Sequence, residues 1–307
     1  MSKVAVIQSA SVPFDAEAST KKAEELIAEV AANGGELAVF PEAFIGGYPK
    51  GTAFGTAVGY RTERGRDEYA RYSNGAITLD GPEVQRLVQA SSEHGVFVVM
   101  GVIERLGNTL YCTALHISPT SGLVENRRKL MPTATERLVW GYGDGSTLET
   151  MDTPFGRVGS VICWENYMPL MRQAMYAQGV QLYCAPTADD RATWQASMTH
   201  IALEGRVFVL SACQYLTRDA FPSDHPFDVE LPHGDVLMRG GSLIIDPSGK
   251  VLAGPVFDEE TILYADVDLE TKTRAHLDFD TVGHYSRPDV FSLTVNTRRA
   301  DSVTFTS

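Results

Sequence analysis

Val158-Gly-Ser-Val-Ile-Cys-Trp-Glu-Asn166 is the stretch around which the fold is organised. Its apolar residues as far as Ile162 predict a buried strand, and Cys163 stands where that strand stops. The next three residues predict a turn that ends before Pro169. Open α/β sheets bind their ligands at the carboxyl ends of strands, and a nucleophile held at a strand end is typical of a covalent enzyme. Cys163 is therefore the first candidate for chemistry.

Two further strand ends carry groups that complement a thiol. Glu42 follows an apolar strand in Val-Phe-Pro-Glu-Ala-Phe, and Lys129 follows another in Arg-Arg-Lys-Leu-Met-Pro-Thr. Alone, Glu42 would be interpreted as a solvated carboxylate and Lys129 as part of a solvated basic run. Together with Cys163 they supply an acid, a cation and a nucleophile. Glu136 adds a second carboxylate one short segment after Lys129.

The rest of the chain alternates β-branched apolar runs with helical periodicity, which predicts an α/β fold with buried strands. An amphipathic helix is expected over 23–31, and Asn33-Gly34-Gly35 ends it. Strands are expected at 4–8, 37–40, 96–103, 110–117, 124–128, 157–163, 181–185, 207–212 and 262–267, with a hairpin over 242–255. The layout begins again at Arg157, so two similarly built halves predict two sheets with helices outside.

Two segments fit this regular plan poorly. Gly51 to Asn74 mixes glycine with several arginines, and Thr217 to Gly241 shows no clear periodicity. We interpret both as long irregular insertions. In a compact domain such insertions are usually functional, as lids or contact surfaces, or else disordered.

Composition narrows the class of protein and of partner. The 307 residues carry a formal net charge of −13, which argues against nucleic acid because cationic contacts to phosphate dominate that affinity. The start of the chain has no pattern of a signal peptide, and no apolar stretch approaches the roughly 20 residues that span a bilayer. The four cysteines show no Cys-x-x-Cys pair. We expect a cytoplasmic protein that does not bind membranes.

The sequence contains no motif typical of cofactor binding or metal binding. The glycine-rich run after Trp140 contains neither a phosphate-binding loop nor a dinucleotide fingerprint. None of the seven histidines shows paired metal-ligand spacing, and no papain-type signature is present. Cys112, Cys184 and Cys213 lie inside strand patterns, where cysteine is usually a small core residue. We therefore expect no cofactor and no metal.

Taken together, the motifs resemble the carbon–nitrogen hydrolase (nitrilase) superfamily. The motifs are Phe-Pro-Glu-Ala-Phe-Ile-Gly-Gly-Tyr-Pro around Glu42, Arg-Arg-Lys-Leu-Met-Pro-Thr around Lys129 and Cys-Trp-Glu-Asn from Cys163, in that order. Cys-Trp-Glu is similar to the nitrilase branch, and stretches such as Tyr-Cys-Ala-Pro-Thr-Ala-Asp are similar to plant-type nitrilases and their bacterial relatives. The resemblance implies a four-layer αββα sandwich. It also implies one domain over residues 1–307 with a short carboxyl tail after about residue 293.

The resemblance assigns a role to each candidate residue. It implies that Cys163 is the nucleophile, Glu42 the general base, Lys129 the cation over the developing charge and Glu136 a second, orienting carboxylate. The residues expected to bind substrate are Tyr48, Trp164, Asn166, Pro186 and Thr187. Asn166 and Tyr167 differ from the histidine and arginine that many relatives have after this motif, so the resemblance does not carry a substrate preference over.

The function implied is hydrolysis of a nitrile to the carboxylic acid and ammonia through cysteine thioimidate and thioester intermediates. The alternatives are an amidase or carbamoylase on the same scaffold, hydration of the nitrile to the amide, and a non-catalytic assembly protein that keeps the fold. A scaffold has no physical need for a thiol, a carboxylate and an ammonium at three strand ends. The resemblance also implies a homodimer that builds a higher homo-oligomer or spiral.

Overall fold

Two β-sheets face each other in the computed structural model, which describes residues 1–228, 233–301 and 303. The first sheet has the order β15 (Thr261–Val267), β1 (Ser2–Gln8), β2 (Leu37–Val39), β5 (Phe97–Leu106), β6 (Thr109–Ser118) and β7 (Gly122–Arg128). The second has the order β12 (Tyr215–Thr217), β13 (Val236–Ile245), β11 (Phe208–Cys213), β10 (Leu182–Thr187), β9 (Gly156–Ser160) and β8 (Met151–Thr153). β14 (Val251–Phe257) pairs with β13.

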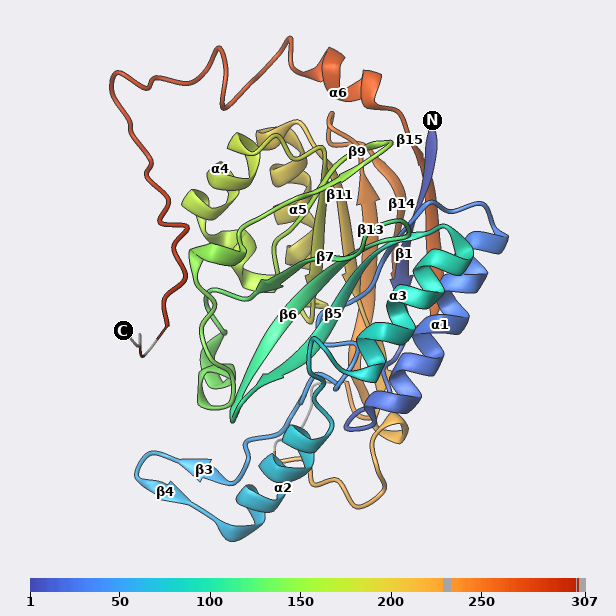
Figure 1. The fold of residues 1–307 in the computed structure, drawn as a ribbon, viewed down its shortest axis with the longest axis vertical. Helices are drawn as coiled ribbons and strands as arrows, with labels where there is room; N and C mark the ends of the chain where they lie inside the picture. Colours follow the sequence, from blue (N-terminus) through green and yellow to red (C-terminus); the bar gives the residue numbers. More distant parts are fainter. Residues whose placement is uncertain (229–232, 302, 304–307) are drawn as a thin grey trace.

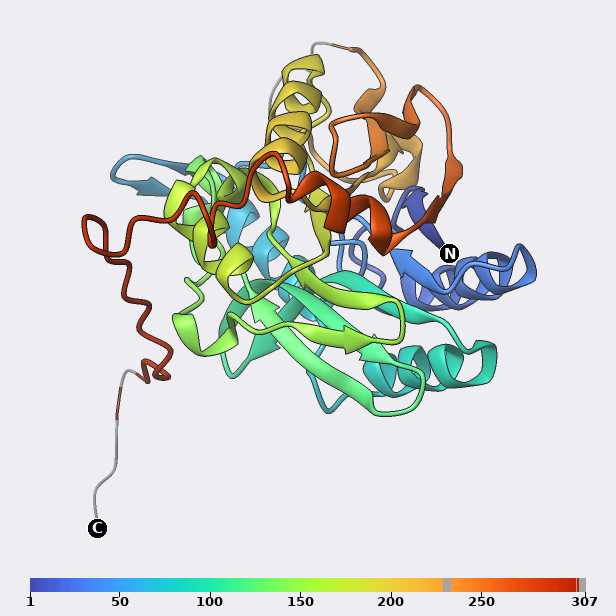
Figure 2. The same ribbon diagram turned by 90° about the horizontal axis from the view of Figure 1, so that it is seen from above.

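Helices cover the outer face of each sheet (Figures 1 and 2). The first sheet is covered by α1 (Ala16–Ala32) and α3 (Pro82–His94), and the second by α4 (Pro169–Ala177) and α5 (Ala192–Gly205). Three buried apolar layers result: one between the sheets and one beneath each helix pair. The predicted four-layer αββα sandwich is therefore confirmed.

Alternation along the strands explains why both faces of each sheet are buried. In β5, Val99 and Ile103 point to the layer between the sheets, whereas Val98 and Met100 point to the helices. The strands at the centre of each sheet are parallel, β1 with β2 and β5, and β9 with β10 and β11. Their carboxyl ends consequently lie at one edge, from which the chain continues to Glu42 and Cys163.

The sequence placed most elements well, but the two segments interpreted as insertions differ. Residues 63–74 form helix α2 (Glu63–Asn74), after a small hairpin of β3 (Thr56–Ala57) and β4 (Tyr60–Arg61), so the expected irregular insertion at 51–74 is wrong. The Thr62 hydroxyl caps α2, but the helix buries only Gly65 and Tyr72 and has no apolar stripe to reveal it. The second insertion contains the start of β13, and its residues 229–232 lie outside the described residues.

The two halves are also less separate than the sequence suggested. β15, from the end of the chain, pairs antiparallel with β1 and completes the first sheet. A last helix, α6 (Leu269–Ala275), follows β15, and the chain then runs without regular structure along the outside of the molecule (Figure 1).

A glycine in β5 allows the segment that carries Glu42 to approach the sheet. A Cβ atom on Gly101 would lie 2.0 Å from the Pro41 carbonyl oxygen and 2.8 Å from the Glu42 Cα. We expect Gly101→Ala to lower the free energy of unfolding by about 2–3 kcal/mol, because the backbone must move to remove the overlap. Gly107→Ala is the control, since its Cβ would meet no atom within 4 Å and only its φ of +59° disfavours alanine. Urea unfolding of both variants measures the difference, and equal midpoints would contradict the packing argument.

Candidate active site

Cys163 occupies a strained turn at the edge of the second sheet. β9 ends at Ser160, and a 3₁₀ turn over Cys163–Tyr167 begins with Cys163 at a φ of +50°, a left-handed conformation that costs non-glycine residues about 1–2 kcal/mol. The Asn166 side-chain amide donates to the carbonyl oxygens of Val161 and Cys163, each at 2.8 Å. These two bonds hold the turn closed, so the thiol has a fixed position at the edge of the sheet.

A buried ion pair joins this turn to the segment that carries Lys129. The Glu165 carboxylate accepts hydrogen bonds from the backbone N–H of Leu130 at 2.6 Å and of Ile162 at 3.0 Å. Arg127 lies 2.8 Å from the same carboxylate, and neither side chain has any exposed area. Because Leu130 follows Lys129 and Ile162 precedes Cys163, Glu165 fixes the distance between the two candidate catalytic segments.

Lys129 lies between two carboxylates. Its Nζ donates to Glu42 Oε1 and to Glu136 Oε2, both at 2.7 Å, and stands 5.4 Å from the centre of the Trp140 ring. Burial alone would lower the pKa of Lys129, but the negative charge of Glu42 and of its other acidic neighbours raises that pKa well above its usual value. Lys129 is therefore a permanent cation in an almost solvent-free position, with 1% of its surface exposed.

Glu42 has one occupied oxygen and one free oxygen. Its Oε1 accepts from Lys129 and, at 3.4 Å, from the Cys112 thiol. Within the described residues its buried Oε2 has no hydrogen-bond partner. Burial raises the pKa of Glu42, Lys129 lowers it and the charge of Glu136 raises it, and the net result is a pKa above the usual value. A buried carboxylate with a free oxygen and a raised pKa can accept and return a proton.

Glu136 is held by a separate set of donors. The Tyr48 hydroxyl donates to Glu136 Oε1 at 2.6 Å, and the backbone N–H of Thr133 donates to Oε2 at 2.6 Å. With Lys129, three groups thus fix the orientation of this carboxylate. Glu136 can therefore keep Lys129 charged and in place.

A cavity of about 180 Å³ opens above the thiol. It is lined by Tyr48, Lys50, Thr133, Glu136, Cys163, Trp164, Ala188, Asp189, Asp190 and Arg191. Burial and the charge of Glu42 raise the pKa of Cys163 to about 12, although Lys129 and a hydrogen bond from Thr187 act in the opposite direction. At neutral pH the sulfur is therefore a thiol, and it needs a base to become a nucleophile.

The structure brings most of the residues predicted from sequence together. Cys163, Glu136, Tyr48 and Trp164 line the cavity, and Lys129 connects Glu136 to Glu42 behind it. The other three predicted contacts lie outside that lining: Asn166 braces the turn, Pro186 lies within β10, and the Thr187 hydroxyl donates to the Cys163 sulfur at 3.3 Å.

Sequence reasoning missed several side chains at the site. Cys112 was interpreted as core, yet its thiol contacts the Glu42 carboxylate. Lys50, Asp189 and Arg191 line the mouth of the cavity, and Trp140 stacks beside Lys129. Asp189 ends the Tyr-Cys-Ala-Pro-Thr-Ala-Asp stretch, but that stretch assigned it no role, and only proximity in space reveals these side chains.

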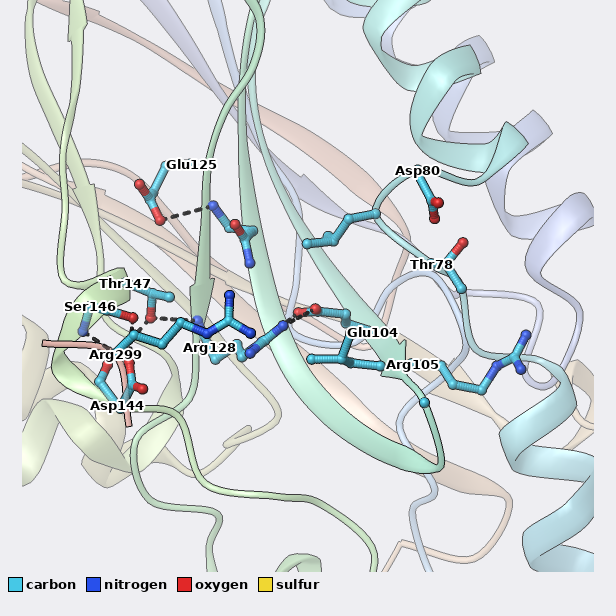
Figure 3. A pocket seen from close by; sticks show the side chains of 14 residues that line it. Thr78, Asp80, Glu104, Arg105, Glu125, Arg128, Asp144, Ser146, Thr147 and Arg299 are labelled. Carbon is cyan, nitrogen blue, oxygen red and sulfur yellow. Dashed lines mark hydrogen bonds and ion pairs between the residues drawn. The ribbon is translucent and has the colours of Figure 1, made fainter. Parts of the chain in front are cut away.

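A larger cavity of about 620 Å³ lies elsewhere, at the outer edge of the first sheet (Figure 3). Some of its polar side chains are engaged with neighbours: Arg128 pairs with Glu104 and stands over the ring of Tyr111, and Asp144 accepts from the N–H and hydroxyl of Ser146. Its lining contains no cysteine or histidine. Size alone therefore does not identify the candidate active site.

Comparisons with known proteins identify the family of the chain and proteins that share its fold. The carbon–nitrogen hydrolase family profile matches residues 3–276. An aliphatic nitrilase of Sinorhizobium fredii (strain HH103) is 59% identical over 96% of this chain and 95% of its own length. A bifunctional nitrilase/nitrile hydratase of Lupinus angustifolius is 51% identical over 99% of this chain and 89% of its own. Among solved structures, Nit3 of Saccharomyces cerevisiae, a member of branch 10 of the nitrilase superfamily, has the same fold, with a TM-score of 0.71 at 22% identity and coverage of 92% of this chain and 96% of that one.

The Arg127–Glu165 pair provides a stability test. Arg127→Met leaves the Glu165 carboxylate buried without its cation, and we expect the free energy of unfolding to fall by about 3–5 kcal/mol. Arg287→Met is the control, because Arg287 and its partner Asp289 are both mostly exposed, and its midpoint of urea unfolding should match that of the wild type. Equal midpoints of urea unfolding for both variants would show that the Arg127–Glu165 pair adds no stability.

His116 predicts a pH dependence of stability. Burial, with a smaller effect of Arg127, lowers the pKa of His116 to about 4, and its ring lies 2.9 Å from the Ser160 hydroxyl. The unfolded chain keeps a pKa near 6.5, so as the pH falls the unfolded state binds this proton first, and stability is lost between about pH 6.5 and 4. We expect His116 to account for about 2 kcal/mol of the loss between pH 7.5 and 5. Urea unfolding of His116→Gln across this range should show a shallower slope, and an unchanged slope would refute the assignment.

Proposed function

The chain belongs to the carbon–nitrogen hydrolase family, and we propose that it is a nitrilase, which converts an organic nitrile and two waters to the carboxylic acid and ammonia. The observation that carries the proposal is the buried Glu42–Lys129–Glu136 cluster beside the thiol of Cys163. Such a set supplies a base, a fixed cation and a nucleophile in one water-poor site. The relatives that are similar over nearly their full length and named as nitrilases make the nitrile the preferred substrate class.

The first half of the reaction forms a bond between sulfur and carbon. Glu42 accepts the thiol proton as the Cys163 sulfur attacks the nitrile carbon. The nitrile nitrogen gains the electron pair of the broken π bond, and Glu42 passes the former thiol proton to this nitrogen to give a thioimidate. The ammonium of Lys129 lowers the energy of the developing negative charge because it is already oriented when the charge appears.

The second half consumes two waters. Glu42 activates the first, which adds to the thioimidate carbon, and the tetrahedral intermediate expels ammonia to leave a thioester. The second water, activated in the same way, releases the acid and returns the Cys163 thiol. Expulsion of the thiol instead of ammonia from the first tetrahedral intermediate would release the amide.

Roles follow for the residues at the cavity. Tyr48 and Trp164 form walls that contact the substrate, and Glu136 orients Lys129. The Thr187 hydroxyl donates a hydrogen bond to the Cys163 sulfur, and the Asn166 amide holds the Cys163 turn closed. Pro186 helps to shape the site through its position near the end of β10.

Release of the amide is a second activity that one comparison supports. One similar relative is named a bifunctional nitrilase/nitrile hydratase, so partial release of amide is a reasonable side reaction for this chain. An amidase or carbamoylase on the same scaffold is the alternative. It would release ammonia from amides or carbamoyl compounds and none from nitriles.

The broader setting is part of the same proposal. We infer one domain over residues 1–307 with a carboxyl tail after about residue 293, a homodimer or larger homo-oligomer, and a cytoplasmic location. Four unpaired, buried cysteines support a reducing compartment. No helix in residues 1–228 and 233–301 is long and apolar enough to cross a membrane.

Ammonia release tests the reaction directly. We expect wild-type protein to release ammonia from at least one aliphatic, arylacetic or aromatic nitrile, with the acid as main product and the matched amide turned over more slowly. Cys163→Ala should reduce this rate to below about 1% of the wild type because no nucleophile remains. Chromatography gives the ratio of acid to amide.

Cys184→Ala is the matched control. Cys184 is equally buried but lies within β10, and its loss should leave nitrile turnover within about twofold of the wild type. Ammonia from amides alone would move the protein to the amidase alternative. Full activity of Cys163→Ala would refute the covalent mechanism.

A further inference from the structure

Asp189, just beyond β10, is the centre of a hydrogen-bonded cluster, and the stretch that ends with it assigned it no role. The Trp164 indole N–H donates to its Oδ2 at 2.8 Å. The Arg191 guanidinium donates to both carboxylate oxygens, at 2.8 and 2.5 Å, and the Arg191 backbone N–H donates to Oδ1 at 3.1 Å. The Asp189 side chain is 3% exposed, so a buried carboxylate is saturated with donors at the mouth of the cavity.

The same residue connects to the thiol through its backbone. The Asp189 N–H donates to Thr187 Oγ1 at 2.9 Å, and the Thr187 hydroxyl lies 3.3 Å from the Cys163 sulfur as its donor. A hydroxyl has one hydrogen, and an N–H that occupies its oxygen leaves that hydrogen free to point to the sulfur. The backbone of Asp189 therefore favours the orientation in which Thr187 donates to Cys163.

The carboxylate also fixes one wall of the cavity. Trp164 follows Cys163 directly, and 42% of its surface is exposed, so packing alone does not hold its ring. The Arg191 guanidinium lies over the indole at 5.0 Å from its centre, while Asp189 holds the indole N–H. The ring is thus held by Arg191 over its face, by Asp189 at its N–H and by an edge contact with Tyr167, whose ring centre lies 5.8 Å away.

We propose that Asp189 is a positioning residue for the proposed reaction, which holds Trp164 as the substrate wall through its carboxylate and aims the Thr187 hydroxyl at the Cys163 sulfur through its backbone. This inference rests on the proposed nitrilase function. The wall sets how well the substituent on the nitrile carbon fits, which affects KM. The hydroxyl stabilises the negative charge that the sulfur acquires when it loses its proton, which affects the chemical step.

The first experiment measures the reactivity of the thiol without any nitrile. Thr187→Val keeps the side-chain shape and removes the hydroxyl. Alkylation of Cys163 by iodoacetamide at pH 8 should then slow about tenfold, because loss of the hydroxyl raises the pKa of the Cys163 thiol by about one. Thr187→Ser should restore the rate to within about twofold of the wild type. The charged and titratable groups near the sulfur, which include Glu42, Lys129, Glu136, Tyr48 and Arg191, are unchanged in both variants.

The second experiment separates substrate fit from chemistry. Asp189→Asn removes the negative charge that accepts from both the Trp164 indole N–H and Arg191, at nearly constant volume, and Trp164→Phe removes the indole N–H itself. Each should raise KM for a nitrile about tenfold and change kcat less than about threefold. The double variant should be no worse than the more affected single variant, because both changes act on the contact between Asp189 and the Trp164 indole N–H. Asp152→Asn is the matched control, since Asp152 makes a similar fork with Arg157 at the exposed surface and should leave KM unchanged.

The two experiments can fail separately. If wild-type protein turns over no nitrile, the proposed function is wrong, yet the alkylation rates of the Thr187 variants still test the link to the sulfur. If nitriles are hydrolysed but Asp189→Asn and Trp164→Phe leave KM within twofold, or add independently, the wall is not held by this contact. Alkylation of Thr187→Val at the wild-type rate would overturn the second half of the proposal. A purely structural role would lower the thermal midpoint without this division between KM and kcat.

Discussion

The ammonium of Lys129, buried between the carboxylates of Glu42 and Glu136, is the constraint to which the rest of the site is fitted. An isolated charge in such a position would cost several kcal/mol of solvation, and only ionised, well-oriented partners can offset that cost. One ammonium, however, has to serve two carboxylates. Burial and the charge of Glu136 therefore raise the pKa of Glu42, and that residue becomes the group in the cluster that can exchange a proton.

Keeping these groups together requires strained backbone. Ala43, Ala134 and Cys163 all have left-handed φ angles, of 52°, 47° and 50°, and each lies in one of the turns that carry the site. Such conformations persist only where the surroundings leave the chain no alternative. Here the surroundings are the apolar layer between the sheets and the Arg127–Glu165 pair, which ties the Lys129 segment to the Cys163 turn. The stability of the fold thus maintains the geometry of the site.

The sequence predicted what periodicity and strand ends encode, and little of what proximity creates. The strands and the ordered positions of Glu42, Lys129 and Cys163 follow from apolar runs that stop at a turn. Helix α2 was missed because it has no apolar stripe: it is capped by the Thr62 hydroxyl and buries only Gly65 and Tyr72. Cys112 gave no signal either, since a cysteine in a strand looks the same whether its thiol meets a methyl group or, as here, a carboxylate. Contacts between segments distant in sequence need the folded chain.

The high pKa of the Cys163 thiol fits this site better than a preformed thiolate would. With Glu42 and Glu136 ionised, the cluster already holds one more negative group than positive groups, and a thiolate would add another negative charge to a buried cavity. Transfer of the thiol proton to Glu42 moves a charge without adding one, because the carboxylate becomes neutral as the sulfur becomes anionic. When the nitrile nitrogen takes that proton, Glu42 is ionised again and the sulfur is covalently bound. The site therefore never carries more charge during the reaction than at rest, and Lys129 can remain a fixed cation throughout.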